Sequence, residues 1–268
     1  MPTSLILQGK HAVVFGGGGS IGAAVARELA TEGAEVFLAG RTSGAVEAVA
    51  RQITAAGGRA QCAVIDALDG PAVDDYIEAV VQQAGSLDIE FNATGPRVSE
   101  YGNGKPAADL PIGEFMLAVD TVLQAQFITA RAAARQMLNQ GSGVIIFLTG
   151  SPARPHGPGA SGIGAAFGAV ENLTRTMAIE LGPAGVRVVC LRTAANPDSR
   201  TIKDTTDVIA KMMNITSDQA TARLADGTML KVSPRTSDTA RAAAFLASDR
   251  ARMMTGTILN SSAGAAMD

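Results

Sequence analysis

The sequence predicts an α/β fold: a doubly wound parallel sheet of about seven strands with helices on both faces. Three observations support this prediction. Short β-rich runs alternate with longer helical patterns, the strand candidates are almost continuously apolar (HAVVF, GVIIFL, VRVVCL), and a glycine-rich turn follows the first of them. Such alternation is typical of a parallel sheet, and apolar strands indicate that both sheet faces are buried.

Each element is placed by its own local pattern. Strands are expected where apolar runs of four to seven residues lie between turn residues, at 11–15, 35–39, 59–65, 89–92, 144–149, 186–191 and 257–260. Helices are expected between them, at 21–32, 44–56, 71–84, 112–139, 161–181 and 238–247.

Composition limits the class of protein. The chain has 268 residues, 47% of them hydrophobic and 18% charged, which fits one domain over 1–268 with a substantial core. A net charge of −3 gives no electrostatic footprint for nucleic acid or an anionic membrane surface. The N-terminal stretch lacks the pattern of a signal peptide and no apolar run is long enough to span a bilayer, so we expect a cytoplasmic protein.

Cysteine and histidine are scarce. Cys62 and Cys190 lie in separate apolar runs, which suggests core packing in a reducing compartment and no disulfide framework. His11 and His156 are the only histidines, and no spacing brings them near the cysteines. We therefore expect no metal site.

The least regular stretch, 193–234, lies between the sixth and seventh strands. It contains one polar helix candidate at 206–225. Ligands of open α/β sheets bind beyond the carboxyl ends of the strands, so this insertion is interpreted as a substrate lid. A surface excursion without a role is the alternative.

A phosphate-binding loop is predicted after the first strand, in HAVVFGGGGSIG. The glycines permit a tight turn and close approach of an anion, and the helix that follows offers unpaired N–H groups and a positive dipole end. The strand–turn–helix context favours dinucleotide binding in a Rossmann-like fold. The cofactor-binding candidates here are Gly16, Gly18, Gly19, Ser20, Ile21 and Gly22.

The end of the second strand indicates which dinucleotide. NAD sites usually carry an Asp or Glu there to bind the ribose hydroxyls, whereas this strand ends at Gly40–Arg41. Arg41 could pair with a 2′-phosphate, so NADP(H) is preferred over NAD(H). A solvated arginine is the alternative.

With these motifs the chain resembles the short-chain dehydrogenase/reductase family over essentially its whole length. The family motif Thr-Gly-x-x-x-Gly-x-Gly matches 15–22, with Phe15 and Ser20 as departures. The resemblance implies further cofactor-binding residues after the third and fourth strands: Asp66 and Ala67 near the adenine, and Asn92, Ala93 and Thr94 in place of an Asn-Ala-Gly motif.

The family's catalytic group is altered in this sequence. The resemblance places Ile163 and Phe167 at the positions of the Tyr-x-x-x-Lys pair, Val122 at that of a relay Asn, and Gly150 at that of the carbonyl-polarising Ser. Ile and Phe can neither ionise nor donate a proton. All four changes together point to lost or changed chemistry.

Other side chains become the catalytic candidates: Ser151, His156 and Tyr101. Ser151 and His156 follow the fifth strand together with Arg154, which could bind a carboxylate or phosphate. Tyr101 begins a Tyr-x-x-x-Lys match with Lys105, but two glycines and a proline make a helix improbable there. That match is interpreted as a coincidence in a loop, from which Tyr101 could still reach a substrate.

These observations favour an NADP(H)-dependent oxidoreductase that reduces a carbonyl or enoyl group of a small molecule. A redox-inactive nucleotide-binding protein and a non-redox enzyme on the same fold are the alternatives. The helices at 112–139 and 161–181 could form a subunit interface or pack tightly on the sheet. The expected partners are a small-molecule substrate and further copies of the chain, as a homotetramer or dimer.

Overall fold

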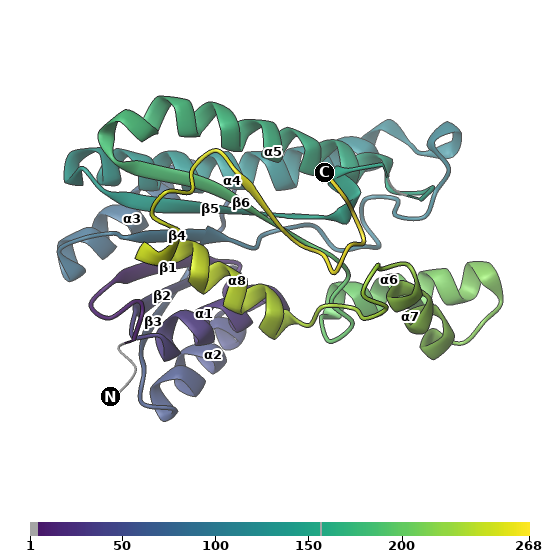
Figure 1. Cartoon of the computed structure of the whole chain (residues 1–268), viewed down its shortest axis with the longest axis horizontal. Coiled ribbons are helices and arrows are strands. Elements are labelled where there is room, and N and C mark those ends of the chain that lie inside the picture. Colours follow the sequence, from purple (N-terminus) through teal and green to yellow (C-terminus); the bar gives the residue numbers. More distant parts are fainter. Residues whose placement is uncertain (1–4, 156) are drawn as a thin grey trace.

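A computed structural model of the chain describes residues 5–155 and 157–268. It contains one seven-stranded parallel sheet with the strand order β3-β2-β1-β4-β5-β6-β7 (Figure 1). The strands are β1 (His11–Phe15), β2 (Glu35–Gly40), β3 (Arg59–Val64), β4 (Ile89–Asn92), β5 (Gly143–Gly150), β6 (Val186–Thr193) and β7 (Ile258–Ser261). The predicted fold class is confirmed.

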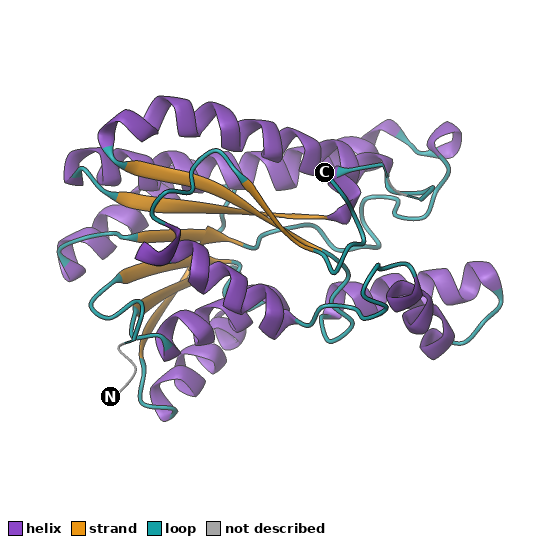
Figure 2. Ribbon diagram, viewed as in Figure 1, coloured by secondary structure: helices purple, strands orange, loops and turns teal. Residues whose placement is uncertain are grey.

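Two layers of helices cover the sheet (Figure 2). One layer is α1 (Ser20–Thr31), α2 (Ser43–Ala55) and α8 (Thr236–Ala247), and the other is α3 (Gly70–Ala84), α4 (Ile112–Gln140) and α5 (Ser161–Leu181). Each layer encloses its own apolar cluster against the sheet. The central strands β1, β5 and β6 are buried on both faces, which explains why their sequence runs are almost continuously apolar.

Local signals set the helix ends. The Asp69 side chain accepts a hydrogen bond from Ala72 N–H at the start of α3, and Gly85 ends that helix with φ +84°. At α4, Pro111 precedes the first turn and Gly141 closes the last one at φ +75°. Polar caps at the start and left-handed glycines at the end are the usual boundaries of helices.

The lid segment differs from its prediction. A single helix at 206–225 is wrong: the segment forms α6 (Arg200–Met213) and α7 (Ser217–Asp226). Asn214 adopts φ +51° and ends α6, and Thr216 with Gln219 forms a capping box that starts α7. A left-handed residue followed at once by a capping box cannot continue one helix. Both helices lie beyond one end of the sheet (Figure 1).

Candidate functional site

The glycine-rich loop joins β1 to α1 at the carboxyl edge of the sheet. Gly16 has φ +70°, and a Cβ there would lie 2.9 Å from the carbonyl carbon of Ala93. A Cβ at Gly22 would overlap the carbonyl oxygen of Gly16. The loop is therefore held tightly between α1 and the end of β4, and only glycine fits at these two positions.

The start of α1 is open to an anion. Gly19 is its N-cap and supplies no side-chain cap, and no acidic residue lies in the first turn. The helix thus presents N–H groups and a positive dipole end beside Gly18, Ser20 and Ile21. A pyrophosphate fits this end chemically.

The ends of β1 and β4 meet where the strand order reverses. Ala93 N–H donates to Phe15 O at 3.0 Å. Asn92 is buried: its Nδ2 donates to Thr129 Oγ1 at 2.9 Å, and its Oδ1 accepts from Thr94 N–H at 2.7 Å. The side chain of Asn92 therefore fixes the turn that faces the glycine loop, at the point where open α/β sheets bind ligands.

Three more predicted cofactor-binding residues lie along the same edge. Arg41 follows β2 and is exposed, and a Cβ on Gly40 would lie 3.9 Å from Gly18 N. After β3, Asp66 accepts a hydrogen bond from Leu68 N–H at 3.0 Å, and Ala67 is buried. The predicted cofactor-binding residues that follow β1, β2, β3 and β4 thus lie along one edge of the sheet. Their contact with a nucleotide stays a prediction.

Ser20 makes a contact that the sequence did not predict. Its Oγ accepts a hydrogen bond from Arg200 N–H at 3.0 Å. Arg200 opens α6, whose N-cap Ser199 accepts from Ile202 N–H. The first turn of α6 is therefore hydrogen-bonded to the glycine-rich loop.

The end of β5 is packed with apolar side chains. A Cβ on Gly150 would lie 3.1 Å from Cε2 of Phe167, so the phenyl ring fills the space beside the Gly150 backbone. Ile163 and Val122 are both buried in the core cluster on this face. Ser151 begins a short 3-10 turn after β5 and is buried.

Tyr101 and Lys105 do not form a pair. They lie in a loop of turns, as expected, and Lys105 Nζ instead contacts Glu114 Oε1 at 2.7 Å. The Tyr101 ring packs in the core with 8% of its surface exposed, and this burial raises the pKa of its phenol to about 12. His156 lies outside the described residues. The catalytic roles of Tyr101, Ser151 and His156 stay predictions.

Arg154 contacts carboxylates of its own chain. Its Nη1 lies 2.7 Å from Glu171 Oε2 and its Nη2 lies 3.0 Å from Asp268 Oδ1. The same two carboxylates bind Arg192, which burial alone would make less basic but whose pKa is raised by hydrogen bonds to Glu171 and Asp268. Sequence reasoning missed this cluster. Its only signals were a Glu inside the predicted helix at 161–181 and an Arg directly after the strand predicted at 186–191.

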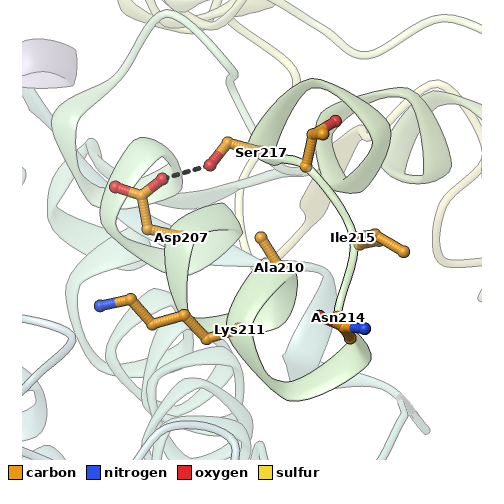
Figure 3. A pocket seen from close by; sticks show the side chains of 7 residues that line it. Asp207, Ala210, Lys211, Asn214, Ile215 and Ser217 are labelled. Atoms are coloured by element: carbon orange, nitrogen blue, oxygen red, sulfur yellow. Dashed lines mark hydrogen bonds between the residues drawn. The ribbon is translucent and has the colours of Figure 1, made fainter.

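Two surface pockets lie among the segments that follow β5 and β6. One, of about 440 Å³, is bordered by Asp207, Lys211 and the α6–α7 turn, where Ser217 Oγ donates to Asp207 Oδ1 at 2.7 Å (Figure 3). The other, of about 340 Å³, lies between Pro152, Arg154 and the start of α5. Within residues 5–155 and 157–268, no group of three or more His, Cys, Asp or Glu side chains is arranged to hold a metal ion.

The described part of the chain also has no helix of the length and apolarity needed to cross a membrane. Cys190 is buried, as expected, while Cys62 is partly exposed at the edge strand β3.

A glycine loop at the switch point of a seven-stranded parallel sheet is typical of dinucleotide-binding α/β folds, and here two helices, α6 and α7, follow β6. The family described as enoyl-(acyl carrier protein) reductase matches residues 17–266. This chain belongs to the short-chain dehydrogenase/reductase family.

Similar proteins are reductases and dehydrogenases. The chain is 31% identical over 257 residues to the 3-oxoacyl-[acyl-carrier-protein] reductase FabG of Staphylococcus epidermidis, covering 95% of this chain and 98% of that one. A dehydrogenase/reductase from Sinorhizobium meliloti superposes with a TM-score of 0.83 at 30% identity, over 98% and 97% of the two chains. A 7 alpha-hydroxysteroid dehydrogenase complexed with NADH and 7-oxo glycochenodeoxycholic acid gives 0.86 at 26% identity, over 99% and 97%.

Proposed function

We propose that this protein is an NADP(H)-dependent oxidoreductase that reduces a carbonyl or enoyl group of a small molecule. The observation that carries the proposal is the exposed Arg41 at the end of β2, where an NAD site would carry a carboxylate. The adjoining helix α2 has no acidic residue in its first turn, so a 2′-phosphate there would meet a guanidinium and free N–H groups. NADP(H), when bound, supplies the hydride.

The proton donor in this proposal is a rebuilt group. The side chains at positions 122, 163 and 167 are apolar, so the candidates are Ser151, His156 and Tyr101. The relatives named above include a 3-oxoacyl-[acyl-carrier-protein] reductase and a 7 alpha-hydroxysteroid dehydrogenase, which supports a ketone or an enoyl group as the reducible group. Two free cysteines support a reducing compartment, the cytoplasm.

Calorimetric titration with NADPH and NADH tests the cofactor. Arg41→Ala should weaken NADPH binding about 10- to 100-fold, the cost of a lost charge-assisted contact, and leave NADH binding nearly unchanged. Arg51→Ala, which removes an exposed arginine further along α2, is the matched control and should leave both affinities unchanged. Equal binding of both nucleotides by the wild type would contradict the NADP preference.

A redox-inactive nucleotide-binding protein, or a non-redox enzyme, is the second candidate. The packing of Phe167 against Gly150 favours it, because an apolar ring lies where the family places ionisable chemistry. One assay, the oxidation of NADPH in the presence of a panel of substrates, distinguishes the two candidate functions. Oxidation of NADPH in the presence of any ketone or enoyl thioester supports the oxidoreductase. Tight NADPH binding without oxidation across such a panel supports the second candidate.

A further inference from the structure

Four charged side chains form a closed ring beside α5. Arg192, in β6, donates from Nε to Glu171 Oε1 at 2.6 Å and from Nη2 to Oε2 at 2.9 Å. Its third nitrogen, Nη1, lies 2.6 Å from Asp268 Oδ1. Arg154 bridges the same two carboxylates from the other side, at 2.7 Å and 3.0 Å. Each arginine thus contacts both acids.

The members of the ring differ in exposure. The side chains of Arg192 and Glu171 are 0% and 1% exposed, so they form a fixed buried pair. The Asp268 side chain is 51% exposed and belongs to the segment that follows β7. Asp268 is therefore the member that can leave without disturbing the sheet.

The charges of the ring require a second anion. Two guanidinium groups face one buried carboxylate, so the ring without Asp268 carries one uncompensated positive charge. Arg192 is fully buried and keeps its pair with Glu171, whereas Arg154 is 29% exposed, so the excess charge is partly desolvated and favours an anion. When Asp268 leaves, Arg192 Nη1 and Arg154 Nη2 become two convergent donors that need an acceptor.

The segment that carries Asp268 also contacts the lid. Leu230 N–H donates to Ala263 O at 3.2 Å, and a Cβ on Gly264 would lie 2.6 Å from Cβ of Met229. Within the segment, Asn260 Nδ2 donates to Ala266 O at 2.7 Å. These contacts hold the segment from 260 to 266 in place, so that Asp268 follows an anchored stretch of chain.

We propose that Arg154 and Arg192 form a binding site for a carboxylate anion, which the Asp268 side chain fills in this structure. A carboxylate group of a small ligand takes the same two donors when the half-exposed Asp268 side chain rotates away from them. The site does not depend on the proposed cofactor, because none of its four residues is among the cofactor-binding candidates.

Chemical rescue tests the site. Asp268→Asn should lower the melting temperature, and acetate should restore it in a saturable way, because acetate supplies the missing carboxylate. Asp268→Ala should show the same lowered melting temperature and the same recovery with acetate. Rescue should disappear in the double variant Asp268→Asn/Arg154→Gln, which lacks one of the two donors. Asp75→Asn, an exposed aspartate on α3, is the matched control and should show neither loss nor rescue.

Three results would overturn the proposal. The first is a melting temperature of Asp268→Asn and Asp268→Ala equal to that of the wild type. The second is a loss of melting temperature that acetate does not reverse. The third is a loss that acetate reverses equally in the double variant, because Asp268 would then have a structural role only. None of these measurements uses NADPH, so they test the carboxylate site independently of the proposed oxidoreductase function.

Discussion

Glu90 lies in the middle of the central strand β4 and is fully buried. Among the described residues, neither of its carboxyl oxygens has a hydrogen-bond partner. Burial raises the pKa of this carboxyl from its usual 4.5 to about 8, because the charged form is poorly solvated there. Glu90 is therefore a neutral acid in the folded protein at neutral pH.

This pKa predicts a pH-dependent stability. Above about pH 4.5 the unfolded chain releases the Glu90 proton while the folded chain keeps it to about pH 8. The free energy of unfolding should therefore fall as pH rises across this interval and then level off. Each unit of pKa difference is worth about 1.4 kcal/mol, so the total is on the order of a few kcal/mol.

Glu90→Gln removes the titration and should gain stability relative to the wild type as pH increases. Urea unfolding at several pH values measures this difference. Glu180→Gln, on the exposed side of α5, is the control and should leave the pH dependence of the wild type in place. A difference between Glu90→Gln and wild type that does not change with pH would contradict the prediction.

At the scale of single residues, contacts within one short stretch of chain could be predicted from the sequence, and contacts between distant elements could not. The glycine loop could be predicted because its contacts, such as Gly22 against Gly16, arise within one short stretch of chain. The pair of Glu171 and Arg192 could not, because it depends on how α5 sits on β6. No spacing in the sequence encodes that register.

At the scale of elements, the boundaries of strands and core helices could be predicted to within one or two residues. Their apolar periodicity and their caps are local properties. The lid could be predicted only as an insertion, because its helices are polar and their division at Asn214 depends on one left-handed residue and a capping box. The hydrogen bond between Arg200 and Ser20 joins residues 180 positions apart, so no local sequence pattern predicts it.

That attachment predicts a local effect of Ser20→Ala. The substitution removes the acceptor for Arg200 N–H, so the first turn of α6 should open more often. Hydrogen exchange of the amides at 200–203 should become faster, by about fivefold for a bond worth about 1 kcal/mol. Ser43→Ala at the start of α2 is the control and should leave α6 unchanged. Unaltered exchange in α6 after Ser20→Ala would show that the bond does not hold the lid.

At the scale of the whole molecule, seven parallel strands place every carboxyl end at one edge. This arrangement could be predicted from the alternation of strands and helices alone. It explains why the glycine loop, Arg41, Asp66 and Asn92, far apart in sequence, lie along one side. The ion-pair ring at Arg192 lies further along the same edge.

The outer faces of α4 and α5 predict the assembly. Phe127 on α4 is 44% exposed and Ile179 on α5 is 77% exposed, although both are large and apolar. We propose that these helices form the subunit interface of a homo-oligomer. Phe127→Glu should lower the molecular mass measured by light scattering toward that of a monomer.

Val64→Glu, at the exposed end of the edge strand β3, serves as the control and should keep the wild-type mass. A wild-type protein that is monomeric at all concentrations would refute the interface.

The contact between Gly150 and Phe167 also has an evolutionary consequence. A serine introduced at position 150 would bring its Cβ to 3.1 Å from the phenyl ring, so the ring of Phe167 would have to shift slightly to admit it. Replacing Phe167 first opens the space that the serine needs. The effect of a serine at position 150 therefore depends on the residue at position 167, because the two side chains share one space.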